Sequence, residues 1–378
     1  MRYLILAFAL GLILKPLQAG NGSPQKESAI SLSCAAYGEV NLGTSFWAAG
    51  GAGLADTTNP EALLYNPAWS ASRKQLILGG GAFHSGMELG YSFTYPLQPV
   101  AVSIQSQFLF PTYLMAASRY SSYLFQAGYR LLYATNSKYE QDFILNNVHH
   151  QGVTYEANYV HDFFIGVNRK INRQLSLGAQ AGLALLTASV RSQEDLLADA
   201  VGTGWHVRFG LLYQPSKSLS LALTYRHLSP IDYQYSMKKD TILAPDGYEY
   251  TLRSPEFFTF GTTLRPAANV RISMRMRYEH STNDTQSPNR LQLSAGVHLH
   301  FSPKWSAAVG AFTLGDLPGS KHFEDVVFLT AGISRQILEN LKLELSVLSS
   351  HFTSDFAQDT NQLDQTRIMM GMQFYLKN

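Results

Sequence analysis

The chain has 378 residues, of which 29 are basic and 27 acidic, and charged residues make up only 15% of it. Ordinary soluble domains carry about 25% charged residues. This low charge, together with 21 Tyr and 21 Phe, favours a surface that faces something other than water. The near balance of charge gives no reason to expect a nucleic acid partner, and the single cysteine, Cys34, excludes an intrachain disulfide.

Residues 1–19 have the pattern of a secretory signal peptide. Arg2 supplies the positive start, residues 3–14 are apolar, and Leu-Gln-Ala at 17–19 provides a small-residue cleavage site. The apolar stretch is shorter than the roughly 20 residues that a membrane-spanning helix needs, and no later stretch approaches that length. We therefore expect the mature chain to start near Gly20 and to leave the cytoplasm.

Residues 20–74 precede the first clear strand and are rich in small residues and in Asn-Pro pairs. Gly50, Gly51 and Gly53 allow close backbone packing and positive φ angles. Pro67 fixes its own φ and biases Asn66 away from helix, and the Asn66 side chain can bond its own backbone in a turn. The pattern predicts either a closely packed irregular segment or a plain turn that leads into the first strand.

From residue 75 to 378 the sequence repeatedly alternates with a period of two. The stretch "RISMRMRY" at 271–278 places apolar residues on one face and Arg271, Ser273, Arg275 and Arg277 on the other. The stretches at 219–225, 291–301 and 341–347 behave in the same way. Successive strand side chains point to opposite faces, so each segment predicts a strand with one apolar and one polar face.

The connections between these strands differ in length. Short turns are predicted at 95–99, 213–218, 265–269 and 301–305, and longer polar links at 192–203, 228–254, 281–289, 315–325 and 352–365. Aromatic residues, Tyr95 and Trp305 among them, flank the short turns. Short turns at one end and long loops at the other are typical of a transmembrane antiparallel β-barrel. We predict an all-β fold of about 14 strands (14–16), each spanning about 10 residues.

Residues 45–74 also resemble a known family. A small-residue run, "AAGGAGLAD" at 48–56, is followed by Tyr65-Asn66-Pro67-Ala68. This order resembles the N-terminal region of FadL-type outer-membrane transport proteins, which move long-chain fatty acids and aromatic hydrocarbons. The resemblance implies a hatch inside the lumen, formed by residues 20–74. Its motif residues would be Gly50, Gly51, Gly53, Asp56, Tyr65, Asn66, Pro67 and Ala68.

The same resemblance implies that the barrel, residues 75–378, lies in the bacterial outer membrane and passively transports a hydrophobic small molecule. The PorV and PorQ barrels of type IX secretion share the motif and bind partners in protein export, so this alternative stays open. Gly371, Phe374 and Leu376 have the spacing of the C-terminal signal that the outer-membrane assembly machinery reads. The lipid bilayer and that machinery are therefore expected partners.

The polar strand faces predict the residues that line the lumen. Arg271, Arg275 and Arg277 share one strand face, and Lys342 and Glu344 share another. They would either bind a carboxylate head group of a substrate or stabilise the lumen by internal ion pairs and contacts to the hatch. A charge on the lipid face would cost roughly 2–4 kcal/mol. His298 and His300 also share a face, but no third metal ligand accompanies them, and no metal site is predicted.

Two further segments carry hypotheses. Residues 192–202 place Leu196, Leu197 and Ala200 near helical spacing, which predicts a short outer helix and a shallow apolar groove for ligand. The stretch "YEHSTND" at 278–284 faintly resembles the His-x-Ser motif of outer-membrane phospholipases, but Ser281 directly follows His280. The two side chains would point to opposite strand faces, which breaks the geometry of a base and its nucleophile. An outer-membrane lipase is a weak alternative, and we expect neither enzymatic activity nor a cofactor.

Overall fold

The computed structural model describes residues 43–70, 75–95, 98–104, 107–145, 148–192, 195–237, 249–252, 254–280, 289–314, 326–356 and 359–377. The predicted signal peptide and Cys34 lie outside these residues. Three short helices come first: α3 (Thr44–Ala48), η2 (Gly53–Ala55) and η3 (Pro60–Leu64). The strands are β1 (Gln75–Tyr95), β2 (Gln98–Ile104), β3 (Gln107–Tyr120), β4 (Tyr123–Leu145), β5 (Val148–Lys170), β6 (Leu175–Ser192), β7 (Asp195–Tyr213), β8 (Leu219–Leu228), β9 (Ile231–Met237), β10 (Glu249–Leu252), β11 (Glu256–Ala267), β12 (Val270–His280), β13 (Arg290–His300), β14 (Trp305–Leu314), β15 (Val326–Leu338), β16 (Leu341–Phe356) and β17 (Asp359–Lys377).

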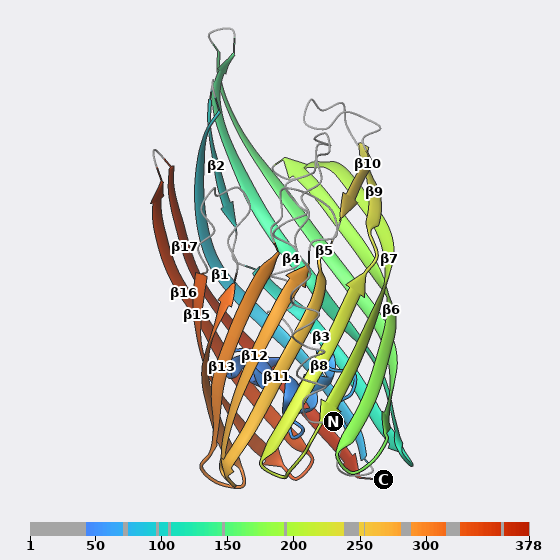
Figure 1. Ribbon diagram of the computed structural model, residues 1–378. Coiled ribbons are helices and arrows are strands. Elements are labelled where there is room, and N and C mark those ends of the chain that lie inside the picture. Colours follow the sequence, from blue (N-terminus) through green and yellow to red (C-terminus); the bar gives the residue numbers. More distant parts are fainter. Residues whose placement is uncertain are drawn as a thin grey trace.

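The described strands form one antiparallel sheet, and 14 of them close into a barrel (Figure 1). Closure comes from β1, which pairs with β17 on one side and with β3 on the other. The ring passes from β8 directly to β11, so β2, β9 and β10 are additional strands beside it. The predicted all-β barrel of about 14 strands is confirmed. No described helix is long and apolar enough to cross a membrane.

The period-two pattern separates an inner face from an outer face. On β12, Arg275 and Arg277 are 4% and 2% exposed, whereas Met274 between two inward positions is 48% exposed. Other strands of the barrel repeat the pattern with outward Phe209, Leu293 and Leu345. An outer surface made of apolar side chains is stable against lipid and not against water, so the sequence pattern and the barrel closure agree.

The short turns gather at one end of the barrel, where β1 begins and β17 ends. Residues 214–218, 268–269 and 301–304 connect strands there, as predicted. A short turn does follow Tyr95, which pairs with Gln98 of β2, but its predicted place at the short-turn end is wrong. Tyr95 ends β1 at the opposite end, since β1 starts at Gln75 beside Lys377. The tight proline-marked turn therefore belongs to the long-loop end.

Several strands are much longer than the predicted span. β4 and β5 have 23 residues each and β1 has 21. At about 3.3 Å per residue, 23 residues extend roughly 75 Å, well beyond the hydrocarbon core of a bilayer. Figure 1 shows β4 and β5 rising far above β11 to β14. Part of the predicted polar link at 352–365 is likewise strand, because β16 continues to Phe356 and β17 starts at Asp359.

Candidate functional site

Residues 43–70, which we call the inner segment, lie inside the barrel and are almost entirely buried (Figure 1). The chain reverses after α3 at Gly50 and Gly51, whose φ angles of +67° and +66° are ones that side chains with a Cβ rarely adopt. At η3, the Asn59 side chain accepts a hydrogen bond from Glu61 N at 3.1 Å, and Pro60 occupies the first turn. Local capping and glycine therefore shape the inner segment.

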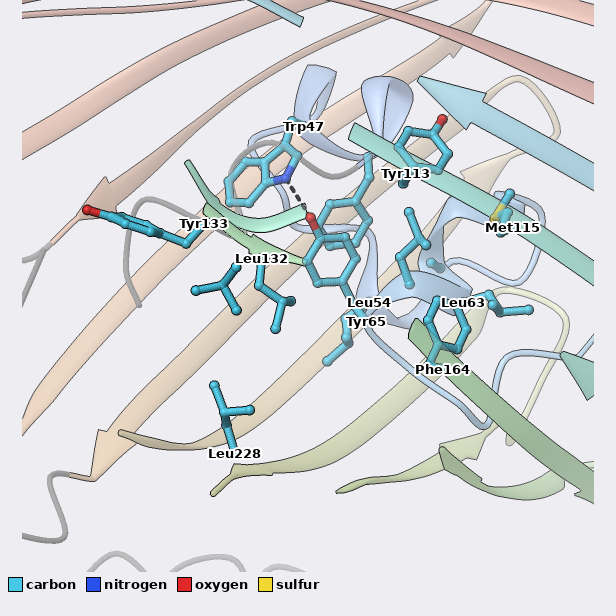
Figure 2. Packing of buried hydrophobic residues seen from close by; sticks show 14 of the residues in the cluster. Trp47, Leu54, Leu63, Tyr65, Tyr113, Met115, Leu132, Tyr133, Phe164 and Leu228 are labelled. Atoms are coloured by element: carbon cyan, nitrogen blue, oxygen red, sulfur yellow. Dashed lines mark hydrogen bonds between the residues drawn. The ribbon is translucent and has the colours of Figure 1, made fainter. Parts of the chain in front are cut away.

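An aromatic cluster joins the two halves of the inner segment. The Phe46 and Tyr65 rings stack with centroids 4.0 Å apart, and Trp47 Nε1 donates to Tyr65 Oη at 2.7 Å. Figure 2 shows this bond within the buried cluster. The Trp47 ring also packs against Phe312 of β14, with centroids 4.7 Å apart. The small-residue run and the Tyr-Asn-Pro-Ala motif thus form one packed unit that touches the wall.

The Tyr-Asn-Pro-Ala motif forms a turn. Asn66 Oδ1 accepts from Ala68 N at 2.9 Å, and Asn66 Nδ2 donates to Leu54 O at 3.2 Å. Three amide side chains of the wall then donate to carbonyl groups around this turn: Gln126 Nε2 to Pro67 O at 2.9 Å, Asn168 Nδ2 to Trp69 O at 3.1 Å, and Gln180 Nε2 to Leu63 O at 3.0 Å. A buried carbonyl without a donor is costly, so these amides fasten the turn. They were not predicted, because they resemble any other inward polar residue.

A buried ionic cluster fastens the end of η3. Arg130 Nη2 lies 2.7 Å from Asp162 Oδ2, with both side chains 0% exposed, and His206 Nδ1 lies 2.8 Å from Asp162 Oδ1. Arg130 Nη1 and Arg208 Nη1 both donate to Leu64 O, at 2.5 and 2.7 Å. None of these wall residues was predicted, since they lie on β4, β5 and β7, far apart in the sequence.

Glycines of the wall make room for the backbone of the inner segment. A Cβ on Gly178 would lie 2.2 Å from Pro67 O, and one on Gly210 would lie 2.3 Å from Asn66 Oδ1. On the other side of the barrel, a Cβ on Gly296 would lie 2.2 Å from Ala49 O. Such distances are far below van der Waals contact, so the seat of the inner segment requires glycine at these positions.

The variant Gly178→Ala is expected to displace the Tyr-Asn-Pro-Ala turn while the barrel still folds. The added methyl group meets backbone atoms of Pro67 and cannot be relieved by a rotamer change, so a destabilisation of roughly 1–3 kcal/mol is expected. Limited proteolysis within residues 59–70, followed by mass spectrometry, measures the displacement. Ala181→Ser, on the outer face of the same strand, is the matched control. Equal protection in both variants would contradict the assigned seat.

Asp56 connects the inner segment to β12. Arg271 Nη1 donates to Asp56 Oδ2 at 3.0 Å, and Arg265 Nη2 lies 3.8 Å from Asp56 Oδ1. Burial by itself would raise the pKa of the Asp56 carboxyl, but the Arg271 guanidinium and hydrogen bonds from Thr58 hold that pKa below its ordinary value. Arg271, which was predicted to line the lumen, therefore binds Asp56, which was predicted as a residue of the hatch motif. His300 contacts the same Arg271 side chain.

A second carboxyl group, Glu61, lies beneath α3. It accepts hydrogen bonds from Thr44 N and Phe46 N, both at 2.9 Å, and from Tyr113 Oη at 2.6 Å. Burial, together with the neighbouring Glu344 carboxylate of β16, raises the pKa of Glu61 to about 8. Glu344 itself pairs with Lys342 Nζ at 2.6 Å. Two buried carboxyl groups, one from the inner segment and one from the wall, thus share an environment that favours one proton between them.

The remaining predicted lumen residues all lie on the inner face. Arg275 stacks over the Trp47 ring, 5.1 Å from its centroid, and Arg277 Nη2 pairs with Glu279 Oε1 at 2.8 Å. His298 is buried. No group of three or more His, Cys, Asp or Glu side chains able to hold a metal ion occurs in the part of the chain that the structure describes.

The predicted outer helix at 192–202 is wrong. β7 starts at Asp195 and runs through Leu196, Leu197 and Ala200 as strand, paired with β6 with one shift of register at Leu197. Ala200 is 4% exposed and belongs to the buried apolar cluster. Three apolar residues near helical spacing are too short a pattern to predict a helix. The neighbouring strand β6 provides hydrogen-bond partners that favour a strand here. Ser281 lies outside the described residues.

The strand β4 changes its partner in the wall next to the inner segment. β3 pairs with β4 from Tyr113↔Arg130 downward, and β2 pairs with β4 from Ile104↔Ser137 upward. The partner of β4 on that side therefore changes between Arg130 and Ser137. Residues 107–109 of β3 pair with β1 alone within the described chain. We call this change of partner, at residues 107–112 of β3 and 131–136 of β4, the wall window.

Buried apolar side chains border the wall window. Leu131, Leu132 and Tyr133 are 2%, 6% and 4% exposed, which departs from strict alternation because β4 bulges at this point. The buried Thr112 hydroxyl has no hydrogen-bond partner among the residues that the structure describes. At the lower edge, Arg130 holds the end of η3 and Tyr113 holds Glu61. The window and the inner segment are therefore linked through two side chains.

Comparisons with known proteins agree with this architecture. A family model described as "Protein of unknown function (DUF2490)" matches residues 167–362. No curated protein matches the chain. The toluene transporter TbuX of Ralstonia pickettii is 14% identical with a TM-score of 0.66, and the match covers 91% of this chain and 100% of that chain.

Two other solved structures are similar. The P. putida toluene transporter TodX is 11% identical with a TM-score of 0.59, covering 85% of this chain and 94% of that chain. A Pseudomonas aeruginosa FadL homologue is 11% identical with a TM-score of 0.61, covering 89% of this chain and 98% of that chain. At this identity the likeness concerns the fold alone, and at that level the predicted resemblance to FadL-type barrels is confirmed.

Proposed function

We propose a function from the barrel and the residues inside it. The chain belongs to the family described as Protein of unknown function (DUF2490), and that description states no activity. The protein lies in the bacterial outer membrane, after export through a signal peptide at residues 1–19. It is a passive channel for hydrophobic small molecules of aromatic or fatty-acid-like kind, and residues 20–74 act as its hatch. The proposal includes no enzymatic activity and no cofactor.

The wall window is the observation that carries this proposal. A hydrophobic molecule that enters the lumen from the long-loop end meets the inner segment, which occupies the way through the barrel. We infer that the wall opens where β4 changes its partner, beside the buried Leu131, Leu132 and Tyr133, and lets the molecule pass to the apolar outer surface. A toluene transporter and a monoaromatic hydrocarbon channel are among the similar solved structures, which supports the substrate class.

Cross-linking across the wall window tests the proposal. Cys34 is replaced by serine, and cysteines are placed at Phe110 on β3 and Ala134 on β4, to be joined by a short bis-maleimide. Uptake of labelled toluene and labelled oleate into cells that carry the protein is then measured. We expect the cross-link to reduce uptake to the level of cells without the protein, because the exit toward the bilayer is closed.

The matched control joins Ala295 and Ala311, which are directly paired on β13 and β14, and it should leave uptake unchanged. If the cross-link at the wall window also leaves uptake unchanged, the window is not the exit. If the protein confers no uptake at all, and a large secreted partner co-purifies with it, the partner-binding function of PorV-type barrels replaces the transport proposal.

A further inference from the structure

Basic side chains gather at the short-turn end of the barrel. Six of them, exposed or half-buried, we call the basic collar: Arg169, Lys170, Arg173, Lys217, Lys304 and Arg335. Glu339 is the one acidic residue on the surface of this end within the ranges that the structure describes. The long links predicted from the sequence hold more acidic than basic residues, and the whole chain is nearly balanced at 29 basic to 27 acidic. The positive charge is therefore a local feature of this end.

The basic collar surrounds the barrel instead of forming one patch. Arg169, Lys170 and Arg173 lie at the turn between β5 and β6, and Lys304 and Arg335 lie together, because Trp305 next to Lys304 pairs with Arg335. Between these two groups stand β7, β8, β11 and β12 on one side, and β16, β17, β1, β3 and β4 on the other. A lipid layer contacts a barrel all around, whereas a single protein partner contacts one side, so this distribution favours lipid.

The apolar outer surface ends where the basic collar begins. On β15 the outward Ile333, which is 46% exposed, is followed two residues later by Arg335. The Arg335 guanidinium lies over the Trp305 ring, 4.8 Å from its centroid, and that of Arg169 lies over the Tyr123 ring at 5.5 Å. Exposed aromatic side chains concentrate where the hydrocarbon of a bilayer meets its head groups. The collar therefore stands at the level of the head groups.

The collar differs from the other basic residues at this end. Arg265 and Lys342 pair with the buried carboxylates of Asp56 and Glu344. No ion pair joins a collar side chain to another residue in the described part of the chain. The cation–π contacts of Arg169 and Arg335 leave their charge in place. Guanidinium and ammonium groups at head-group level form charge-assisted hydrogen bonds with phosphate oxygens.

We propose that the basic collar binds anionic phospholipids, through their phosphate head groups, in the leaflet at the short-turn end. In the proposed outer membrane this is the periplasmic leaflet, so the inference rests on the proposed location but not on transport. A basic residue beside an anionic lipid surface favours it by roughly fivefold. The effect fades within a Debye length of about 10 Å at 0.1 M salt, so it acts on lipids that touch this end and not on those at the other.

Quenching of tryptophan fluorescence by brominated phospholipids tests the inference. The full-length protein is placed in phosphatidylcholine vesicles, and brominated phosphatidylglycerol or brominated phosphatidylcholine is added in rising proportion. In the variant Trp205→Phe the exposed reporter is Trp305, in the collar, and in Trp305→Phe it is Trp205, further toward the long-loop end of β7. Trp47 and Trp69 are buried and do not reach the lipid.

Trp305 is expected to be quenched at a roughly fivefold lower proportion of the glycerol lipid than of the choline lipid. Trp205 should be quenched equally by both. Equal quenching of Trp305 would overturn the inference, and an acidic protein would then be the partner that fits the collar. The assay uses no transported substrate, so its outcome is independent of the uptake experiment.

Two changes to the charge sharpen this test. In the Trp205→Phe background, Lys304→Gln together with Arg335→Gln should remove most of the preference of Trp305 for the glycerol lipid. Arg191→Gln, at an exposed position near the long-loop end of β6, is the matched control and should retain it. Raising the salt to about 0.5 M should weaken the preference, because the Debye length shortens. A preference that survives the double substitution, or that does not respond to salt, would overturn the proposal.

Discussion

Replacing Arg130 with methionine is expected to lower the free energy of unfolding by about 3–5 kcal/mol and to loosen η3 from the wall. The change leaves Asp162 buried at 0% exposure without its guanidinium partner, and it removes one of the two donors to Leu64 O. Urea unfolding in lipid vesicles measures the loss of free energy, and hydrogen exchange of residues 60–66 measures the loosening.

The double variant Arg130→Met, Asp162→Leu separates the ionic contribution from the anchoring one. Removing both charges avoids the uncompensated carboxylate, so most of the lost stability should return. Hydrogen exchange at η3 should stay fast, because one of the two donors to Leu64 O is still missing. Arg335→Met, a change on the outer face, should alter neither quantity by more than about 0.5 kcal/mol. A single variant as stable as the wild type would show that this cluster does not fasten the inner segment.

Raising the pH from 5 to 9 is expected to weaken the hold of the inner segment, and Glu61 is the expected cause. The pKa of Glu61 rises from its ordinary 4.5 to about 8 in the folded protein. Between these two values the folded state binds the extra proton, so stability falls as the pH rises and levels off above about 8. The loss amounts to a few kcal/mol, at roughly 1.4 kcal/mol per pKa unit. Urea unfolding at each pH measures it.

Glu61→Gln should flatten this pH dependence, because the amide stays neutral throughout. It should also lower stability at pH 5, since the amide has one acceptor oxygen where Glu61 accepts from Thr44 N, Phe46 N and Tyr113 Oη. Glu339→Gln, at the turn between β15 and β16, is expected to retain the slope of the wild type. A slope that persists in Glu61→Gln would assign the pH response to another group.

The sequence by itself determined the architecture. Alternation on segments such as 271–278 separated an apolar face from a polar one, and that period is a property of neighbouring residues in any strand. The order of short turns and long links predicted an antiparallel barrel of about 14 strands. The fold of the Tyr65-Asn66-Pro67-Ala68 turn was also predictable, since Pro67 and Asn66 act on the backbone next to them.

Only the tertiary structure decided which wall residues meet the inner segment. In the sequence, Gln126, Asn168 and Gln180 look like any other inward polar residue. Arg130, Asp162 and His206 come together only when β4 to β7 pair in one register. The wall window depends on where β2 replaces β3 as the partner of β4. The helical spacing of apolar residues at 196–200 does not form a helix, because this segment pairs with β6 as a strand. Barrel closure and strand register depend on the whole chain. A local pattern in the sequence therefore predicts which face of a strand each side chain lies on, but not which residues come into contact.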